Sequence, residues 1–111
     1  IDPLSVKATT ENSDANGVLK NMEIGEGSVE EVLNDKFSIR SAPLILANIL
    51  APVIIKLFSQ GLRNLASVNG ILVLSGILEE QEPNVLLAAE KCGLKLLQKK
   101  QMGDWVSLAM Q

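Results

Sequence analysis

Asn48 is the side chain in this sequence whose type and position most clearly suit it for chemistry. It stands alone in the apolar run PLILANILAPVII, residues 43–55. An asparagine amide offers an acceptor oxygen and donor hydrogens, so it can orient an amine, a ribose or a purine edge. The amide does not titrate near neutral pH, and it therefore cannot act as a general base.

Ser75 and Gly76 interrupt a second apolar run, residues 71–74, at the corresponding place. Because the chain contains no His, Ser75 has no partner for Ser-His catalysis, and we interpret it as a small turn residue. Glu79, Glu80 and Glu82 follow. Their position favours complementing the dipole of a helix that they open over forming a catalytic carboxylate pair.

Missing residue types exclude several classes of function. The chain has no His, no Tyr and one Cys, which excludes Cys-His catalysis and zinc sites built from His and Cys ligands. We therefore expect no metal site. Cys92 cannot form an internal disulfide and lies in an apolar helical pattern, which indicates a buried thiol and a reducing, cytoplasmic setting.

The apolar run around Asn48 is too short to cross a membrane. A spanning helix needs about 20 apolar residues, whereas Pro43, Asn48 and Pro52 interrupt this run and Lys56 closes it. We expect a buried strand at residues 44–47, followed by a helix from Pro52. The apolar residues that recur at helical spacing in that segment are Val53, Leu57, Leu62 and Leu65.

Local signals predict the elements before this run. Asp2-Pro3 is a favourable start for a helix, and Asn16-Gly17 is a favourable end. We expect a short strand at residues 21–24 and one helical turn at residues 29–33.

Local signals also predict the elements after the apolar run. Residues 71–74 predict a second buried strand, which Ser75-Gly76 would break. A third helix, with Pro83 in its first turn, is expected to end near Gly93. Residues 94–101 and 105–110 predict a hairpin around Gly103-Asp104.

Strand, helix, strand, helix and hairpin together predict an α/β layered domain whose sheet is parallel at first. In such sheets ligands bind beyond the carboxyl ends of the parallel strands. If the two apolar strands are neighbours, Asn48 and Ser75-Gly76 lie on one rim. The alternative role for Asn48 is to satisfy loose backbone groups at the end of its strand.

Four patches of the sequence occur in the order IDPLSVKATTENSDANGV, LANIL, GILVLSGILEEQ and GDWVSLAM. They are similar to the Ile-Asp-Pro run with its helix, the Val-Ala-Asn-Ile-Leu motif, the Leu-Ser-Gly-Ile-Leu strand and turn, and the final strand of one bacterial family. The chain thus resembles the carboxyl-terminal part of the PrmA-like methyltransferases, which modify large-subunit ribosomal protein eleven.

The resemblance implies a Rossmann-like fold that binds S-adenosylmethionine and transfers its methyl group to lysine side chains and α-amino groups of the ribosomal protein. It implies that Asn48 contacts the cofactor or the amine and aims the nitrogen lone pair, and that Ile1 packs against the adenine. In-line transfer to a neutral amine depends mainly on positioning, so the lack of His is compatible with it.

The family's Gly-rich cofactor turn, its ribose-binding acid and its amino-terminal substrate domain have no counterpart in residues 1–111. We therefore expect residues 1–111 to be the carboxyl-terminal part of a single methyltransferase domain, truncated at its amino-terminal side and inactive by itself. The strand at residues 21–24 would then be loose or differently paired.

Two other functions remain open. The chain could be a non-catalytic α/β module that self-associates through an exposed sheet edge. It could also belong to an amino-methyltransferase with a nucleobase acceptor. The net charge of −3 and the pI of about 4.9 weigh against a nucleic-acid surface.

Overall fold

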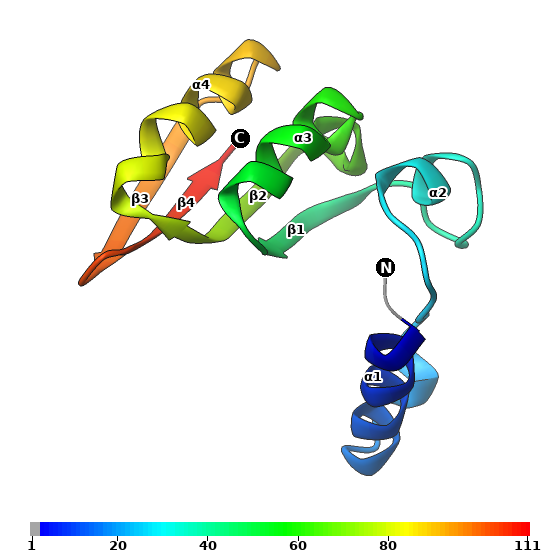
Figure 1. The fold of residues 1–111 in the computed structure, drawn as a ribbon. Helices are drawn as coiled ribbons and strands as arrows, with labels where there is room; N and C mark the ends of the chain where they lie inside the picture. The colour runs from blue at the N-terminus through cyan, green and yellow to red at the C-terminus, as the bar shows by residue number, and fades with distance from the viewer. Residues whose placement is uncertain (1–2) are drawn as a thin grey trace. The chain divides into compact units, whose positions relative to one another are not determined.

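The structure is a computed structural model that describes residues 3–111 and divides the chain into two compact units, Ile1–Arg40 and Ser41–Gln111. The first unit holds a 13-residue helix, a 3₁₀ helix and a short second helix joined by loops, and the second unit holds the sheet (Figure 1).

Helix α1 (Pro3–Ala15) confirms the first predicted helix and its end. Gly17 has a φ of +70°, the left-handed conformation that glycine adopts at little cost. Its amide donates to the Asp14 carbonyl, and the Val18 amide donates to the Ser13 carbonyl. This pair of bonds is the Schellman motif, which satisfies carbonyls that the helix end would leave free.

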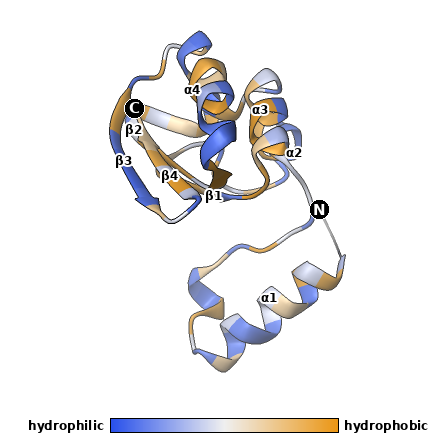
Figure 2. Cartoon of the chain, turned by 60° about the vertical axis from the view of Figure 1, so that its left-hand side comes forward, coloured by the Kyte–Doolittle hydropathy of each residue, from blue (hydrophilic) through white to orange (hydrophobic). Residues whose placement is uncertain are grey.

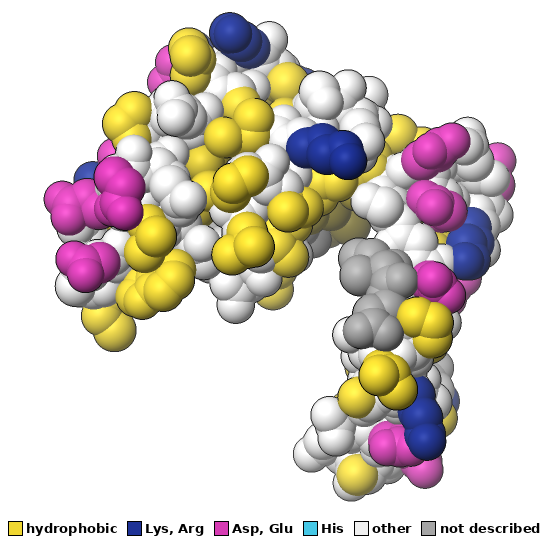
Figure 3. Space-filling view, viewed as in Figure 1, with side chains coloured by type: hydrophobic (Ala, Val, Ile, Leu, Met, Phe, Trp, Pro, Cys, Tyr) yellow, Lys and Arg dark blue, Asp and Glu magenta, His cyan; other side chains and the backbone are white. Residues whose placement is uncertain are grey.

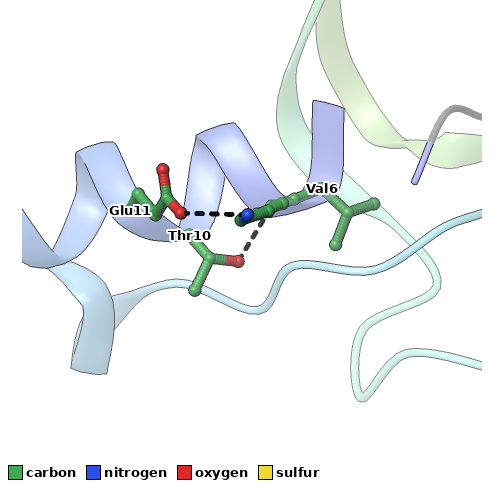
Figure 4. A network of polar contacts seen from close by, with 4 residues as sticks. Val6, Thr10 and Glu11 are labelled. Carbon is green, nitrogen blue, oxygen red and sulfur yellow. Dashed lines mark hydrogen bonds and ion pairs between the residues drawn. The ribbon is translucent and has the colours of Figure 1, made fainter. Parts of the chain in front are cut away.

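Polar contacts along its own length support α1. The Thr10 hydroxyl donates to the Val6 carbonyl at 2.8 Å, and Lys7 lies 3.9 Å from the Glu11 carboxylate (Figure 4). Ser13 is the buried residue of this helix. Helix α1 therefore contributes little apolar burial to its unit.

The strand predicted at residues 21–24 does not form, and the expectation that this segment lacks its regular strand pairing is confirmed among the described residues. The chain forms a 3₁₀ helix, η1 (Leu19–Asn21), and then continues without a partner strand among the described residues. A segment without a neighbouring strand to pair its backbone hydrogen-bonding groups cannot become part of a sheet. Helix α2 (Val29–Leu33) is the predicted helical turn.

A capping interaction starts α2. The Glu31 carboxylate accepts a hydrogen bond from the Ser28 amide at 3.1 Å. This backbone bond is the main reason why the pKa of Glu31 lies below the ordinary value of a glutamate. The Ser-x-x-Glu pattern therefore stabilises α2 through its charged form.

The second unit is a four-stranded mixed sheet with the order β1-β2-β4-β3. Strand β1 (Ala42–Asn48) pairs in parallel with β2 (Ala66–Leu78). Strand β4 (Trp105–Met110) pairs antiparallel with both β2 and β3 (Leu96–Met102). The predicted α/β class, the parallel pair and the closing hairpin are confirmed.

Helices α3 (Ala51–Ser59) and α4 (Glu82–Lys91) lie side by side on one face of this sheet, each after one parallel strand (Figure 1). Two 3₁₀ turns, η2 (Leu62–Leu65) and η3 (Glu79–Gln81), join the helices to the strands. Between helices and sheet lies an aliphatic core. Its largest fully buried side chains are Ile54, Leu72, Leu74, Ile77, Val85, Val106, Leu108 and Met110.

Helix α3 is shorter than the sequence predicts, and it buries another face. It ends at Ser59 because Gly61 takes a left-handed φ of +102° and redirects the chain into η2. Its buried residues are Ala51, Ile54 and Phe58, whereas Val53, predicted on the apolar face, is 41% exposed. Cys92 is half-buried, less than predicted, at the end of α4.

The two edges of the sheet differ in chemistry. Strand β3 is exposed along its length and carries Lys99 and Lys100, so it is largely hydrophilic (Figure 2). Strand β1 carries no charge, and on the sheet face opposite the helices its Leu44 and Leu46 are 53% and 72% exposed. No helix of the described residues is long and apolar enough to cross a membrane.

Candidate functional site

Asn48 is the last residue of β1 and lies directly opposite Ser75 of β2. The parallel pairing runs in register from Leu44 opposite Ile71 to this pair. The carboxyl end of β1 therefore meets β2 at Ser75-Gly76. The prediction that Asn48 and Ser75-Gly76 share one rim is confirmed.

The prediction that Ser75-Gly76 breaks the second strand is wrong. Strand β2 continues through these two residues and forms a bulge there. Leu74 is opposite Leu108 of β4, and the next pair is Ile77 opposite Val106. Two residues of β2, Ser75 and Gly76, thus face the single Ser107. Such a β-bulge bends its strand and re-aims nearby side chains, and it often occurs beside functional sites.

Gly76 brings two oxygen atoms together at the rim. Its φ is +77°, and a Cβ added to it would lie 2.9 Å from Asn48 Oδ1 and 3.0 Å from the Ile49 carbonyl oxygen. Both acceptors therefore lie against the Gly76 backbone. Neither the Ile49 carbonyl nor the close approach to Gly76 was predicted, although a glycine inside an apolar strand is itself a signal of close backbone approach.

Among the described residues, the Asn48 amide makes no hydrogen bond, and its residue is exposed. The alternative reading, in which this side chain satisfies backbone groups at the end of the strand, finds no supporting bond. An amide that packs by its oxygen and stays accessible is free to contact a guest molecule.

Ser75 and Ser107 lie beneath the rim on the sheet face opposite the helices, with their hydroxyl oxygens 3.2 Å apart. The sequence has no His that could activate either hydroxyl in the manner of a Ser-His pair. Together with the hairpin they border a shallow pocket of about 440 Å³. Its other lining residues are Gly76, Lys100, Gln101, Met102, Trp105 and Val106.

Acidic side chains gather where α4 begins (Figure 3). Glu82 pairs with Lys99 of β3, with Glu82 Oε1 and Lys99 Nζ 2.6 Å apart, on the helical side of the sheet. This contact ties α4 to the sheet, in agreement with a structural role. Within residues 3–111 no group of three or more His, Cys, Asp or Glu could hold a metal ion.

Ile1 and Asp2, named above for adenine packing and for the start of α1, lie outside the described residues. The rim that the structure describes thus consists of Asn48 Oδ1, the Ile49 carbonyl and the Gly76 backbone.

The model of the family Ribosomal protein L11 methyltransferase (PrmA) matches residues 1–111 of this sequence. The chain belongs to this family. The ribosomal protein L11 methyltransferase of Pelotomaculum thermopropionicum is 34% identical over 109 residues, which are 98% of this chain and 33% of that protein. The one from Synechococcus sp. is 34% identical over 110 residues, which are 99% of this chain and 36% of that protein.

A solved structure of the family shares the fold. The ribosomal protein L11 methylase of Lactobacillus delbrueckii subsp. bulgaricus matches with a TM-score of 0.82 and 28% identity, over 100% of this chain and 54% of that one. The chain spans about a third of the length of the curated L11 methyltransferases. Its sheet and helices are therefore part of the Rossmann-like methyltransferase fold of that family.

Proposed function

We propose that residues 1–111 form the carboxyl-terminal part of the catalytic domain of a cytoplasmic protein methyltransferase. The activity would be transfer of a methyl group from S-adenosylmethionine to lysine side chains and α-amino groups of ribosomal protein L11. Family membership over the whole chain supports this proposal. The observation that carries the role of the site is the pair of acceptors, Asn48 Oδ1 and the Ile49 carbonyl, at the carboxyl end of β1.

The two acceptors suit an amine. A neutral primary amine has two N–H bonds and one lone pair, so two oxygens that accept both N–H bonds leave the lone pair free. The lone pair is then held in one direction, and such orientation supplies a large share of the rate in reactions that need no proton transfer in the bond-forming step. Asn48 and Ile49 would do this in the proposed enzyme.

The described rim also fits one side of the cofactor. S-adenosylmethionine, when bound, supplies an electrophilic methyl group on a positively charged sulfur. Acceptor oxygens are compatible with that charge, and the residues that form the rim carry no cation. The Gly-rich turn expected to hold the cofactor's methionine end is absent from residues 1–111, so this chain would supply the acceptor side of the site.

Asn48→Ala in the intact methyltransferase tests the proposal. Because the substitution removes one of two orienting acceptors, we expect the rate of methyl transfer to L11 to fall about ten-fold or more. Asn84→Ala is the matched control, since Asn84 is an exposed asparagine on α4 and is not among the residues that form the rim. Full activity of the Asn48 variant would refute the assigned role. Calorimetric titration of the 111-residue chain with S-adenosylmethionine shows whether this chain binds the cofactor without the remaining part of the methyltransferase.

Self-association through β1 is a second candidate function for the chain as it stands. Strand β1 pairs on one side only among the described residues, and it lacks the charged residues that protect β3. Its exposed Leu44 and Leu46 would be buried in a dimer. A nucleobase acceptor has no such support, since the net charge is −3.

Sedimentation equilibrium measures whether the chain self-associates through β1. If β1 is the contact, the chain sediments as a dimer, and Leu46→Lys returns it to a monomer because lysine on an edge strand opposes pairing. Val68→Lys is the control, since Val68 is 93% exposed near the other end of β2. A chain that is monomeric throughout would exclude self-association.

A further inference from the structure

Gly76 combines two properties that Gly17 and Gly103 do not share. Its φ of +77° is in the left-handed region, and the space that a side chain would occupy is filled by Asn48 Oδ1 and the Ile49 carbonyl oxygen. Gly17 and Gly103 have similar φ values of +70° and +59° but nothing within 4 Å of an added Cβ. The left-handed conformation of Gly76 therefore belongs to the bulge in β2, and its lack of a side chain allows the contact with the two oxygens.

We propose that Gly76 is a positioning residue that holds the Asn48 amide in its orientation at the rim. The proposal rests on the function proposed for Asn48 and adds that the Gly76 backbone fixes the orientation of the Asn48 side chain. The bulge at Ser75-Gly76 presents the Gly76 backbone, and the Asn48 amide rests on it by its oxygen. The Asn48 Oδ1 atom is thereby kept beside the Ile49 carbonyl oxygen at the rim.

The two oxygens respond differently to a side chain at position 76. The Ile49 carbonyl belongs to the backbone just before Leu50, the N-cap residue of α3, so it can move only if the start of α3 moves. Asn48 Oδ1 ends a side chain with rotatable bonds and can be pushed aside. A Cβ at position 76 would therefore relocate the Asn48 amide first, because real Cβ contacts shorter than 3.0 Å hardly occur.

Gly76→Ala and Gly103→Ala form a matched pair for testing this on the 111-residue chain. Both substitutions place an L side chain at positive φ, but only the first adds a clash with the rim. We expect Gly103→Ala to lower the melting temperature by about 4–8 °C and to leave the side-chain NH₂ resonances of Asn48 unchanged. Gly76→Ala should lower the melting temperature further and shift those resonances.

A double substitution isolates the contact. Asn48→Ala removes the displaced oxygen, so the extra loss of melting temperature caused by Gly76→Ala should shrink in the Asn48→Ala background. If Gly76→Ala does not fold, Gly76→Asn is examined instead, since Asn tolerates left-handed backbone but still carries a Cβ. Unshifted Asn48 resonances, or failure of both variants to fold, would make Gly76 a purely structural residue and overturn the proposal.

Assays of methyl transfer by the intact enzyme distinguish the positioning role of Gly76 from the role proposed for Asn48 in the reaction. We expect Gly76→Ala to lower kcat about ten-fold, with a smaller change in KM for the cofactor, and to add no further loss to Asn48→Ala. Gly103→Ala should keep the wild-type kcat. An impaired Asn48 variant with a fully active Gly76 variant would overturn positioning by Gly76 alone. A fully active Asn48 variant would overturn the proposed function, while the resonance and melting tests of the contact would still stand.

Discussion

Shortening Leu74 to alanine should destabilise the second unit by about 3–4 kcal/mol. Leu74 is fully buried in β2, one residue before the rim, and lies between Ala47 of β1 and Leu108 of β4. The strands on both sides are hydrogen-bonded to β2. They cannot close readily on the space that the shorter side chain leaves.

The magnitude follows from the atoms removed. Leucine to alanine deletes the equivalent of three methylene groups, each worth about 0.8 kcal/mol of burial, or about 2.4 kcal/mol together. The unfilled cavity adds to this loss, and comparable core substitutions cost about 2–5 kcal/mol. A domain of this size has a total stability of about 4–10 kcal/mol. The variant should therefore melt at least about 10 °C lower while remaining folded in the cold.

Urea unfolding at pH 7, followed by circular dichroism and by the fluorescence of the single tryptophan, Trp105, measures the loss. Val68→Ala is the control, because Val68 is 93% exposed on the same strand and its substitution should change stability by less than about 0.5 kcal/mol. A loss of unfolding free energy below about 1 kcal/mol for Leu74→Ala would refute the packing of Leu74 between β1 and β4, since truncating a fully buried leucine costs about 2–5 kcal/mol.

Two further predictions concern charged groups. The hydrogen bond from the Ser28 amide favours the charged form of Glu31, so the pKa of Glu31 in the folded chain lies below 4.5. The charged Glu31 therefore stabilises α2 fully above pH 4.5, and this stabilisation disappears as the pH falls through the lowered pKa. The Ser28 amide resonance should titrate with that lowered pKa, and titration at the ordinary glutamate value would contradict the capping bond. Lys99→Met should reduce the free energy of unfolding by about 1 kcal/mol, since it leaves Glu82, whose side chain is only 16% exposed, without its partner. Lys100→Met, with no ion pair among the described residues, is the control, and equal losses from both would show that the pair contributes nothing.

Elements bounded by local signals were predictable from the sequence. Gly17 ends α1, Pro83 lies in the first turn of α4, and the hairpin turns at Gly103. Each of these features depends on backbone conformations that proline or glycine prefers over a few neighbouring residues. Parallel pairing of the two apolar strands followed from their continuous hydrophobicity.

Features that depend on distant neighbours were not predictable. The apolar residues of α3 could be aligned at Val53 and Leu57 or at Ile54 and Phe58, and only contact with the sheet selects the second set. Likewise, residues 21–24 have a composition suitable for a strand, but no described strand pairs with them. In both cases the local pattern permits two outcomes, and packing selects one.

The sequence by itself determined the order of helices and strands in the second unit, the likeness to the L11 methyltransferases and the place of Asn48 at the end of a parallel strand. Only the tertiary structure decided what surrounds that amide. The bulge at Ser75-Gly76 arises from the register of β2 against β4, and the contact of Gly76 with Asn48 arises from the register of β2 against β1. Registers between segments this far apart depend on the packing of the whole sheet, which no short stretch of sequence encodes.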